Sequence, residues 1–108
     1  MVQAITATEA FALIKDDKAI LIDVREADEF KGEHIVDALS VPLSSLEDGF
    51  KILDLPKDKI FLFQCLRGGR GQTACEHIQR LGLYQNKIIN LEGGIQAWKK
   101  SGLPVIKS

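Results

Sequence analysis

The most informative stretch of the sequence is Lys59-Ile60-Phe61-Leu62-Phe63-Gln64, which continues directly into Cys65-Leu66-Arg67-Gly68-Gly69-Arg70-Gly71-Gln72. Its first half is a short apolar run, typical of a strand buried on both faces of a parallel sheet. Its second half is rich in glycine and arginine. It leads into a helix that we expect to begin at about Gly71 and to end at Gly82. The stretch therefore predicts a strand, a tight polar loop and a helix, in that order.

The same alternation of short apolar runs and amphipathic stretches continues on both sides. Thr6 and Glu9 fit a capping box at the start of a helix. The other expected elements are strands over 19–24, 38–41 and 87–91, a helix over 26–31 that ends at Gly32, a helical turn from Ser44 or Ser45, and a helix over 95–101. Strands alternating with helices predict an α/β fold with a mostly parallel sheet covered on both faces. Ligands of such sheets bind beyond the carboxyl ends of the strands, where Asp23, Cys65 and Glu92 are expected.

Length and composition restrict the function further. The chain has 108 residues, which predicts one domain over 1–108. Its 14 basic and 15 acidic residues give a formal net charge of −1, which argues against a nucleic-acid or anionic-membrane binder. The two cysteines and two histidines form no zinc-finger spacing, so we expect no metal. No secretory signal or membrane-length apolar run is visible, so the expected location is the cytoplasm.

The glycine-rich loop carries the chemistry. Glycines let successive backbone N–H groups point inward, and a helix N-terminus adds unpaired donors and partial positive charge. Arg67 and Arg70 add full charges. These groups together predict a cup for an anion with Cys65 at its base, in a field that favours the nucleophilic thiolate over the thiol.

Other interpretations of the cysteines and of the loop stay open at this point. A lone cysteine is often only a small buried apolar residue. Glycine-rich turns between strand and helix also occur in nucleotide-binding folds, although neither the P-loop nor the dinucleotide fingerprint is present. Cys75 lies on the apolar stripe of its helix and is interpreted as structural.

Four motifs, in this order and spacing, resemble the single-domain rhodaneses, a family of sulfurtransferases. The similarity covers nearly the whole chain. The motifs are Leu21-Ile22-Asp23-Val24-Arg25-Glu26 with Glu29-Phe30; Gly32-Glu33-His34-Ile35 followed by Ala38 and Pro42; Cys65-Leu66-Arg67-Gly68-Gly69-Arg70, which fits C-x-x-G-x-R; and Leu91-Glu92-Gly93-Gly94-Ile95-Gln96-Ala97-Trp98 followed by Gly102-Leu103-Pro104-Val105.

The resemblance implies a rhodanese-like α/β fold with a central, mostly parallel sheet of about five strands flanked by helices on both faces. It implies that Cys65 is the nucleophile and becomes a persulfide. Asp23 and Arg25 would form a strand-end polar network that supports the loop. Family members often carry Ser or Ala where this chain has Gly71. The residues implied to cradle the outer sulfur or bind substrate are Leu66, Arg67, Gly68, Gly69, Arg70 and Gly71.

The implied activity is a ping-pong sulfur transfer from a donor such as thiosulfate to cyanide or a thiol, with no cofactor. The expected partners are these small molecules and a protein sulfur acceptor, with neither nucleic acid nor membrane. One rival interpretation is a sulfur carrier or interaction module. Another is a cysteine-dependent phosphatase or arsenate reductase, whose loops resemble C-x5-R. Here only four residues separate Cys65 from Arg70.

Overall fold

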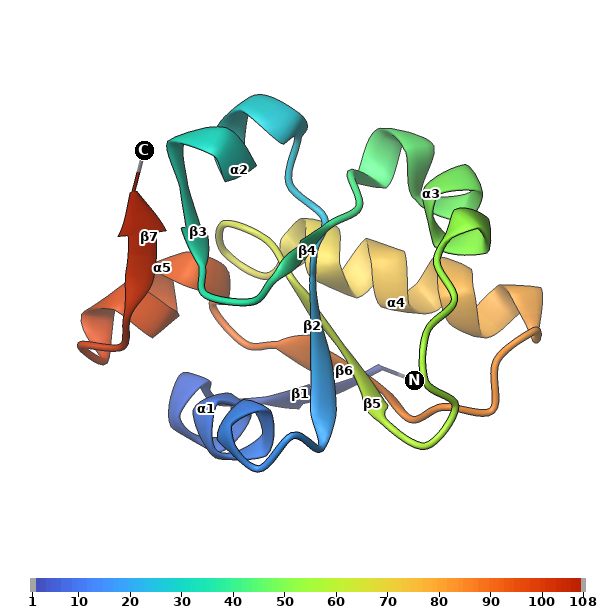
Figure 1. Cartoon of the computed structure of the whole chain (residues 1–108), viewed down its shortest axis with the longest axis horizontal. Helices are drawn as coiled ribbons and strands as arrows, with labels where there is room; N and C mark the ends of the chain where they lie inside the picture. The colour runs from blue at the N-terminus through green and yellow to red at the C-terminus, as the bar shows by residue number, and fades with distance from the viewer. Residues whose placement is uncertain (1, 108) are drawn as a thin grey trace.

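The computed structural model describes residues 2–107, and Figure 1 shows the arrangement of their helices and strands. The elements in chain order are β1 (Gln3–Ile5), α1 (Ala7–Lys15), β2 (Ala19–Asp23), α2 (Ala27–Gly32), β3 (Glu33–Ile35), β4 (Leu39–Ser40), the 3-10 turn η1 (Leu43–Ser45), α3 (Leu46–Ile52), β5 (Ile60–Gln64), α4 (Gly69–Leu81), β6 (Ile88–Leu91), α5 (Gly94–Lys100) and β7 (Val105–Lys107).

The main sheet has five strands in the order β1-β6-β5-β2-β4, and every neighbouring pair is parallel. This confirms the expected α/β architecture. Along β2 and β5 the register runs from Ala19 opposite Ile60 to Asp23 opposite Gln64. The carboxyl ends of these two central strands are therefore level. Cys65, the residue after β5, emerges at this edge of the sheet.

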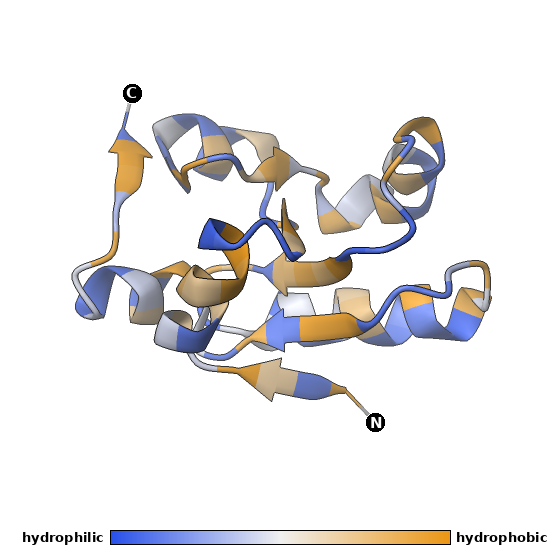
Figure 2. Cartoon of the chain, turned by 60° about the horizontal axis from the view of Figure 1, so that its bottom comes forward, coloured by the Kyte–Doolittle hydropathy of each residue, from blue (hydrophilic) through white to orange (hydrophobic). Residues whose placement is uncertain are grey.

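Helices cover both faces of the sheet, which is why the central strands read as continuous apolar runs. Buried residues of α3 and α4 pack against one face, with Phe50 and Ile78 at the centre of that layer. Residues of α1 and α5 pack against the other face, where Trp98 is buried beside Leu62. Figure 2 shows the hydrophobic colour along the strands and mixed colours along the helices.

The ends of several helices follow from local chemistry. The predicted capping box at α1 is confirmed, because the Thr6 hydroxyl accepts a hydrogen bond from the Glu9 amide and the Glu9 carboxylate accepts one from the Thr6 amide. Gly82 caps α4 in a left-handed conformation, as expected. Gly32, in contrast, is the last residue of α2. That helix ends because Glu33 adopts an extended backbone and enters β3.

Helix α4 begins at Gly69, two residues earlier than the expected Gly71. The cause is Gly68, whose φ of 116° turns the chain sharply enough for the helix to start at once. Arg70 therefore lies in the first turn of α4. The helical turn expected from Ser44 or Ser45 is present as η1, and it continues into the longer helix α3. Three strands were not expected, namely β1 and the antiparallel pair β3 and β7. None of the helices within residues 2–107 is long and apolar enough to cross a membrane.

Candidate active site

Cys65 lies at the junction between the buried sheet and a surface hollow. Its residue exposure is 1%, and its Sγ accepts a hydrogen bond from the Gly68 amide at 3.0 Å. Cys65 also lines an open pocket of about 420 Å³ together with Leu66, Arg67, Gly69 and Arg70. The sulfur thus has one backbone donor in place and the charged loop around the opening of the pocket.

The carbonyl groups of the loop are held by the neighbouring turn between β6 and α5. The amide of Ile95 donates to the Cys65 carbonyl at 2.8 Å, and the amide of Gln96 donates to the Leu66 carbonyl at 3.1 Å. The approach is so close that a Cβ at Gly94 would overlap the Cys65 carbonyl oxygen and lie 2.6 Å from the Leu66 carbonyl carbon. Glycine at position 94, with a φ of 60°, is therefore required by both space and backbone conformation.

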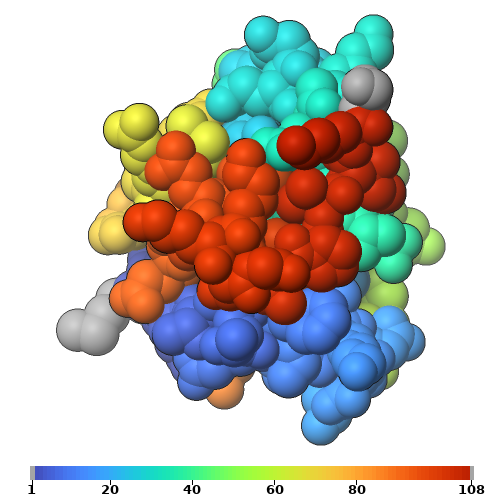
Figure 3. All heavy atoms as spheres, turned by 90° about the vertical axis from the view of Figure 1, so that its left-hand side faces the viewer, coloured from blue at the N-terminus to red at the C-terminus, as the bar shows by residue number. Residues whose placement is uncertain are grey.

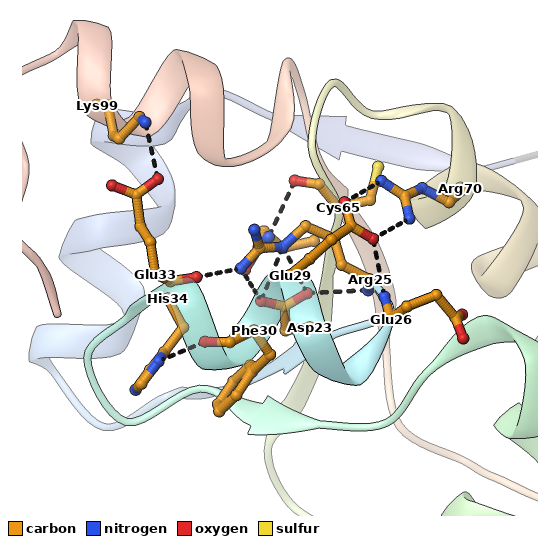
Figure 4. A network of polar contacts seen from close by, with 11 residues as sticks. Asp23, Arg25, Glu26, Glu29, Phe30, Glu33, His34, Cys65, Arg70 and Lys99 are labelled. Atoms are coloured by element: carbon orange, nitrogen blue, oxygen red, sulfur yellow. Dashed lines mark hydrogen bonds and ion pairs between the residues drawn. The ribbon is translucent and has the colours of Figure 1, made fainter. Parts of the chain in front are cut away.

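Arg70 is fixed by Glu29 of α2. Its two terminal nitrogens donate to the two carboxylate oxygens at 2.7 and 3.0 Å, a bidentate pair that Figure 4 shows beside Cys65. The hydrogen bonds from Arg70 lower the pKa of Glu29 to about 2, although partial burial opposes this shift. Glu29 in turn raises the pKa of Arg70, to which the nearby Cys65 also contributes. The pair ties α2 to the first turn of α4.

Asp23 and Arg25 form a second, fully buried pair next to the first. The Arg25 side chain donates to both Asp23 oxygens, with a shortest distance of 2.8 Å, and to the Glu33 carbonyl at 2.6 Å. The Asp23 carboxylate also accepts the Arg25 amide at 2.9 Å. The hydrogen bonds of this pair run to the start of β3, and the charge of Arg25 also makes a small contribution to the lowered pKa of Glu29.

Sequence reasoning missed two buried amides beside the loop. Gln64 Nε2 donates to the Cys65 carbonyl at 2.9 Å, and Asn90 Nδ2 donates to the Gly68 carbonyl at 3.0 Å. Both side-chain oxygens are buried without a partner among the described residues. A signal was present for each, because a polar residue within or at the end of an otherwise apolar strand is unusual unless its side chain has a partner there.

Arg67 is exposed and faces a larger surface. It lines the Cys65 pocket and also a groove of about 760 Å³ along α5, whose other residues include Gln96, Lys99 and Lys100. Figure 3 shows the loop, coloured yellow, beside the orange of α5, with the red of β7 on the far side. Lys99 is paired with Glu33 at 2.8 Å. The positive charge of the groove, which adjoins the opening above Cys65, therefore comes mainly from Arg67 and Lys100.

The remaining residues that the sequence singled out lie in structural positions. Cys75 is buried in α4, and burial raises the pKa of its thiol to about 12, which leaves it unreactive at neutral pH. His34 Nδ1 lies 3.0 Å from the Phe30 carbonyl, and the two rings stack. Trp98 donates to the Pro104 carbonyl, and Glu92 is exposed. Across residues 2–107, no group of three metal-ligating side chains gathers.

Comparisons of the sequence and of the fold with known proteins point to one family. The family model described as a rhodanese-like domain matches residues 6–101. A thiosulfate sulfurtransferase GlpE of Coxiella burnetii is 30% identical over 99 residues, which cover 92% of this chain and 89% of that protein. An uncharacterized protein of Synechocystis is 42% identical over 96 residues, 89% of this chain, and the chain spans about half (51%) of its length. A crystal structure of a rhodanese-related protein from Thermoplasma volcanium is 34% identical, with a TM-score of 0.82 and coverage of 96% and 97% of the two chains.

Proposed function

The chain belongs to the rhodanese-like domain family, and from that premise we propose that it moves sulfane sulfur from a donor such as thiosulfate to a thiophilic acceptor through a persulfide on Cys65. Its relatives named as sulfurtransferases support a sulfurtransferase. The match over residues 6–101 supports one domain of this kind over 1–108. The observation that carries the proposal is the Gly68 amide placed 3.0 Å from Cys65 Sγ at the base of a pocket rimmed by two arginines.

The first half-reaction is a displacement at sulfur. The Cys65 thiolate attacks the outer sulfur of thiosulfate, a new S–S bond forms, and the S–S bond of thiosulfate breaks. Sulfite leaves with the electron pair, so the step needs no proton and no cofactor. The backbone amides of Leu66 to Gly71 stabilise charge on the transferred sulfur, in the way that an oxyanion hole stabilises oxygen. Arg67 attracts the doubly charged donor from solution.

The second half-reaction returns the enzyme to its starting state. Cyanide or a thiolate attacks the outer sulfur of the persulfide and forms a bond to it, while the bond to Cys65 Sγ breaks. The electron pair of that bond regenerates the Cys65 thiolate. A free nucleophilic thiol needs a reducing compartment, which favours the cytoplasm as the site of action. Neither nucleic acid nor membrane takes part in the proposed cycle.

The length of the loop favours sulfur transfer over phosphate ester hydrolysis. Four residues separate Cys65 from Arg70, one fewer than in the C-x5-R loops of cysteine-dependent phosphatases and arsenate reductases. A shorter loop forms a smaller cup, which suits one sulfur atom better than a tetrahedral oxyanion. In addition, two N–H groups of the Arg70 guanidinium donate to Glu29, which leaves fewer donors for a phosphate group.

A protein acceptor is the second candidate for the sulfur. The cationic groove beside the loop shares Arg67 with the Cys65 pocket and continues to Lys100 on α5. Its volume of about 760 Å³ exceeds what cyanide or a small thiol fills. An acceptor protein with an acidic segment next to its receiving thiol would fit this surface. Fast single-turnover transfer to such a protein, with slow turnover on small thiols, supports the carrier role.

The assay that tests the proposal measures thiocyanate formed from thiosulfate and cyanide. A ping-pong cycle gives parallel lines in double-reciprocal plots at several cyanide concentrations. Cys65→Ser removes the nucleophile and is expected to lower the rate at least a thousandfold. Cys75→Ala, the matched control on the other cysteine, is expected to keep the rate within about twofold. Equal activity of Cys65→Ser and the wild type would contradict the proposal.

A further inference from the structure

Asn90 is the polar residue of β6 that reaches the loop. It lies in a strand whose other residues are all buried and apolar, and only 5% of its own surface is exposed. Its Nδ2 donates to the Gly68 carbonyl at 3.0 Å. Since a carbonyl accepts only from a donor, this contact fixes the orientation of the amide and turns Oδ1 the other way. Oδ1 then lies buried without a hydrogen-bond partner among the described residues.

Gly71 provides the space in which Oδ1 lies. A Cβ at Gly71 would overlap Asn90 Oδ1, and the same point lies 3.7 Å from Cys65 Sγ. Gly71 belongs to α4 and is absent from the residues with positive φ within 2–107, so its backbone does not require glycine. The absence of a side chain at position 71 is therefore explained by Asn90 alone.

The Gly68 residue is the link between Asn90 and the sulfur. Its carbonyl accepts from Asn90 Nδ2 and from the Gln72 amide, both at 3.0 Å, and its amide donates to Cys65 Sγ at 3.0 Å. With φ at 116° and ψ at −23°, the direction of the N–H depends on how the carbonyl is held. Fixing the carbonyl with two donors thus aims the amide at the sulfur.

We propose that Asn90 is a positioning residue for Cys65 and that Gly71 is its obligatory partner, the glycine that leaves room for the Asn90 carbonyl. The proposal rests on the role of Cys65 given above. Asn90 acts through Gly68 and does not touch the substrate. A buried, unpartnered carbonyl oxygen costs stability, and the structure retains it because the same side chain orients the Gly68 amide, the one donor within residues 2–107 that is directed at the sulfur.

The test compares Asn90→Ala, Gly71→Ala and the double variant by the rate at which iodoacetamide alkylates Cys65, measured from pH 5 to 10 by peptide mass spectrometry. Alkylation needs the thiolate but no sulfur donor, so it reports on Cys65 even in a protein that transfers no sulfur. Asn86→Ala is the matched control, because the Asn86 side chain also donates to backbone carbonyls, those of Pro56 and Lys59, which precede β5, whereas Cys65 follows its other end. Thermal unfolding of each variant is followed in parallel.

Asn90→Ala is expected to slow alkylation at neutral pH by about tenfold and to move the pH profile about one unit upward, the effect of weakening one hydrogen bond to a charged sulfur. Gly71→Ala is expected to slow it at least as much, since the new methyl group displaces Asn90. In the double variant the Asn90 amide that the methyl group would overlap is gone, and Cys65 Sγ lies at an ordinary contact distance of 3.7 Å. The double variant is therefore expected to match Asn90→Ala rather than to multiply the two losses.

A pH profile of Asn90→Ala that overlays the wild type would overturn the proposal. So would multiplicative losses in the double variant, or an equal shift in Asn86→Ala. Failure of the proposed function looks different, because the wild type would then take up no sulfur from thiosulfate while its alkylation still depended on Asn90. Should Gly71→Ala not fold, Asn90→Ala and the double variant still decide between these outcomes.

Discussion

Two junctions between strand and helix lie at the same edge of the sheet, and their difference explains the site. In both the β5–α4 and the β6–α5 junction, the helix begins after a glycine in a left-handed conformation, Gly68 and Gly93 respectively. Neither helix therefore has a side-chain cap at its N-terminus. At β6–α5 the first free amides donate to the carbonyls of Cys65 and Leu66. At β5–α4 the Gly68 amide points instead at Cys65 Sγ. The free amides of the β6–α5 junction thus hold the β5–α4 junction in shape.

The comparison shows that the loop around Cys65 is held in shape by a neighbouring turn. Backbone amides that point at a ligand leave their own carbonyls to be satisfied elsewhere, and buried carbonyls without partners are costly. Here the β6–α5 turn and Asn90 of β6 donate hydrogen bonds to the loop carbonyls. Glu29 of α2 holds Arg70. The glycines of both junctions follow from this division of roles.

The largest predicted effect follows from Gly94→Ala. A methyl group there would press on the carbonyls of Cys65 and Leu66 and place a non-glycine residue at a φ of 60°. We expect the free energy of unfolding to fall by about 3 kcal/mol, from left-handed strain plus overpacking, with loss of sulfur transfer. The measurement is chemical denaturation together with the thiocyanate assay.

Gly69→Ala is the matched control on the other junction. Nothing lies within 4 Å of a Cβ at that position, and its φ is not positive. Alanine in a helix is favoured over glycine by roughly 0.5–1 kcal/mol, so this variant is expected to be unchanged or slightly more stable. Equal losses in the two variants would show that the β6–α5 turn does not brace the loop.

A smaller effect is expected from Glu29→Gln, which breaks the charge pair with Arg70. The pKa of Glu29 falls from 4.5 unfolded to about 2 folded, so the pair's contribution is complete above pH 4.5 and is lost as the pH falls toward 2. Both side chains are about one-third exposed, 31% for Glu29 and 35% for Arg70. Solvent screening therefore limits the loss at pH 7 to about 1 kcal/mol.

The check is the difference in unfolding free energy between Glu29→Gln and wild type, measured from pH 7 down to pH 2.5. The difference should narrow below pH 4.5. Asp28→Asn removes the same charge from an exposed neighbour on α2 and should show no such narrowing. A constant difference at every pH would mean that the pair does not stabilise the loop through its charge.

The smallest predicted effect concerns Arg67, which lines the pocket above Cys65. Arg67→Ala should raise the KM for thiosulfate several-fold at low ionic strength and leave the KM for a neutral organic trisulfide unchanged, since only the charged donor is steered. Arg80→Ala, at the other end of α4, removes an equal charge as control. Equal changes for both donors would refute charge selection by Arg67.

The sequence predicted the parts of the fold that depend on local patterns. The strands over 19–24 and 59–64 are predictable because each contains a run of four consecutive apolar residues, and the start of α1 because Thr6 and Glu9 form a capping box. Strand β1 has three residues, and its existence depends on pairing with β6, a contact between distant segments that no local pattern encodes. The same holds for β3 and β7.

Only the part of the site that is contiguous in the sequence could be predicted. Cys65 and its loop are contiguous in sequence, so their composition alone indicated an anion cup. The contacts that hold the loop are distant in sequence, since Glu29 lies 41 residues from Arg70 and Asn90 lies 22 residues from Gly68. The reason for a glycine at position 71 is likewise a contact between distant residues, because a Cβ there would overlap Asn90 Oδ1.

Whether sulfur is carried on Cys65, as we propose, can be measured by mapping the mass of peptides after incubation with thiosulfate. We expect one extra sulfur atom on the peptide that contains Cys65, removed by cyanide and absent in Cys65→Ser. The peptide that contains Cys75 is expected to stay unmodified. An unmodified Cys65 after treatment with thiosulfate and with polysulfide would show that Cys65 is not the sulfur carrier, as would sulfur found on Cys75 instead.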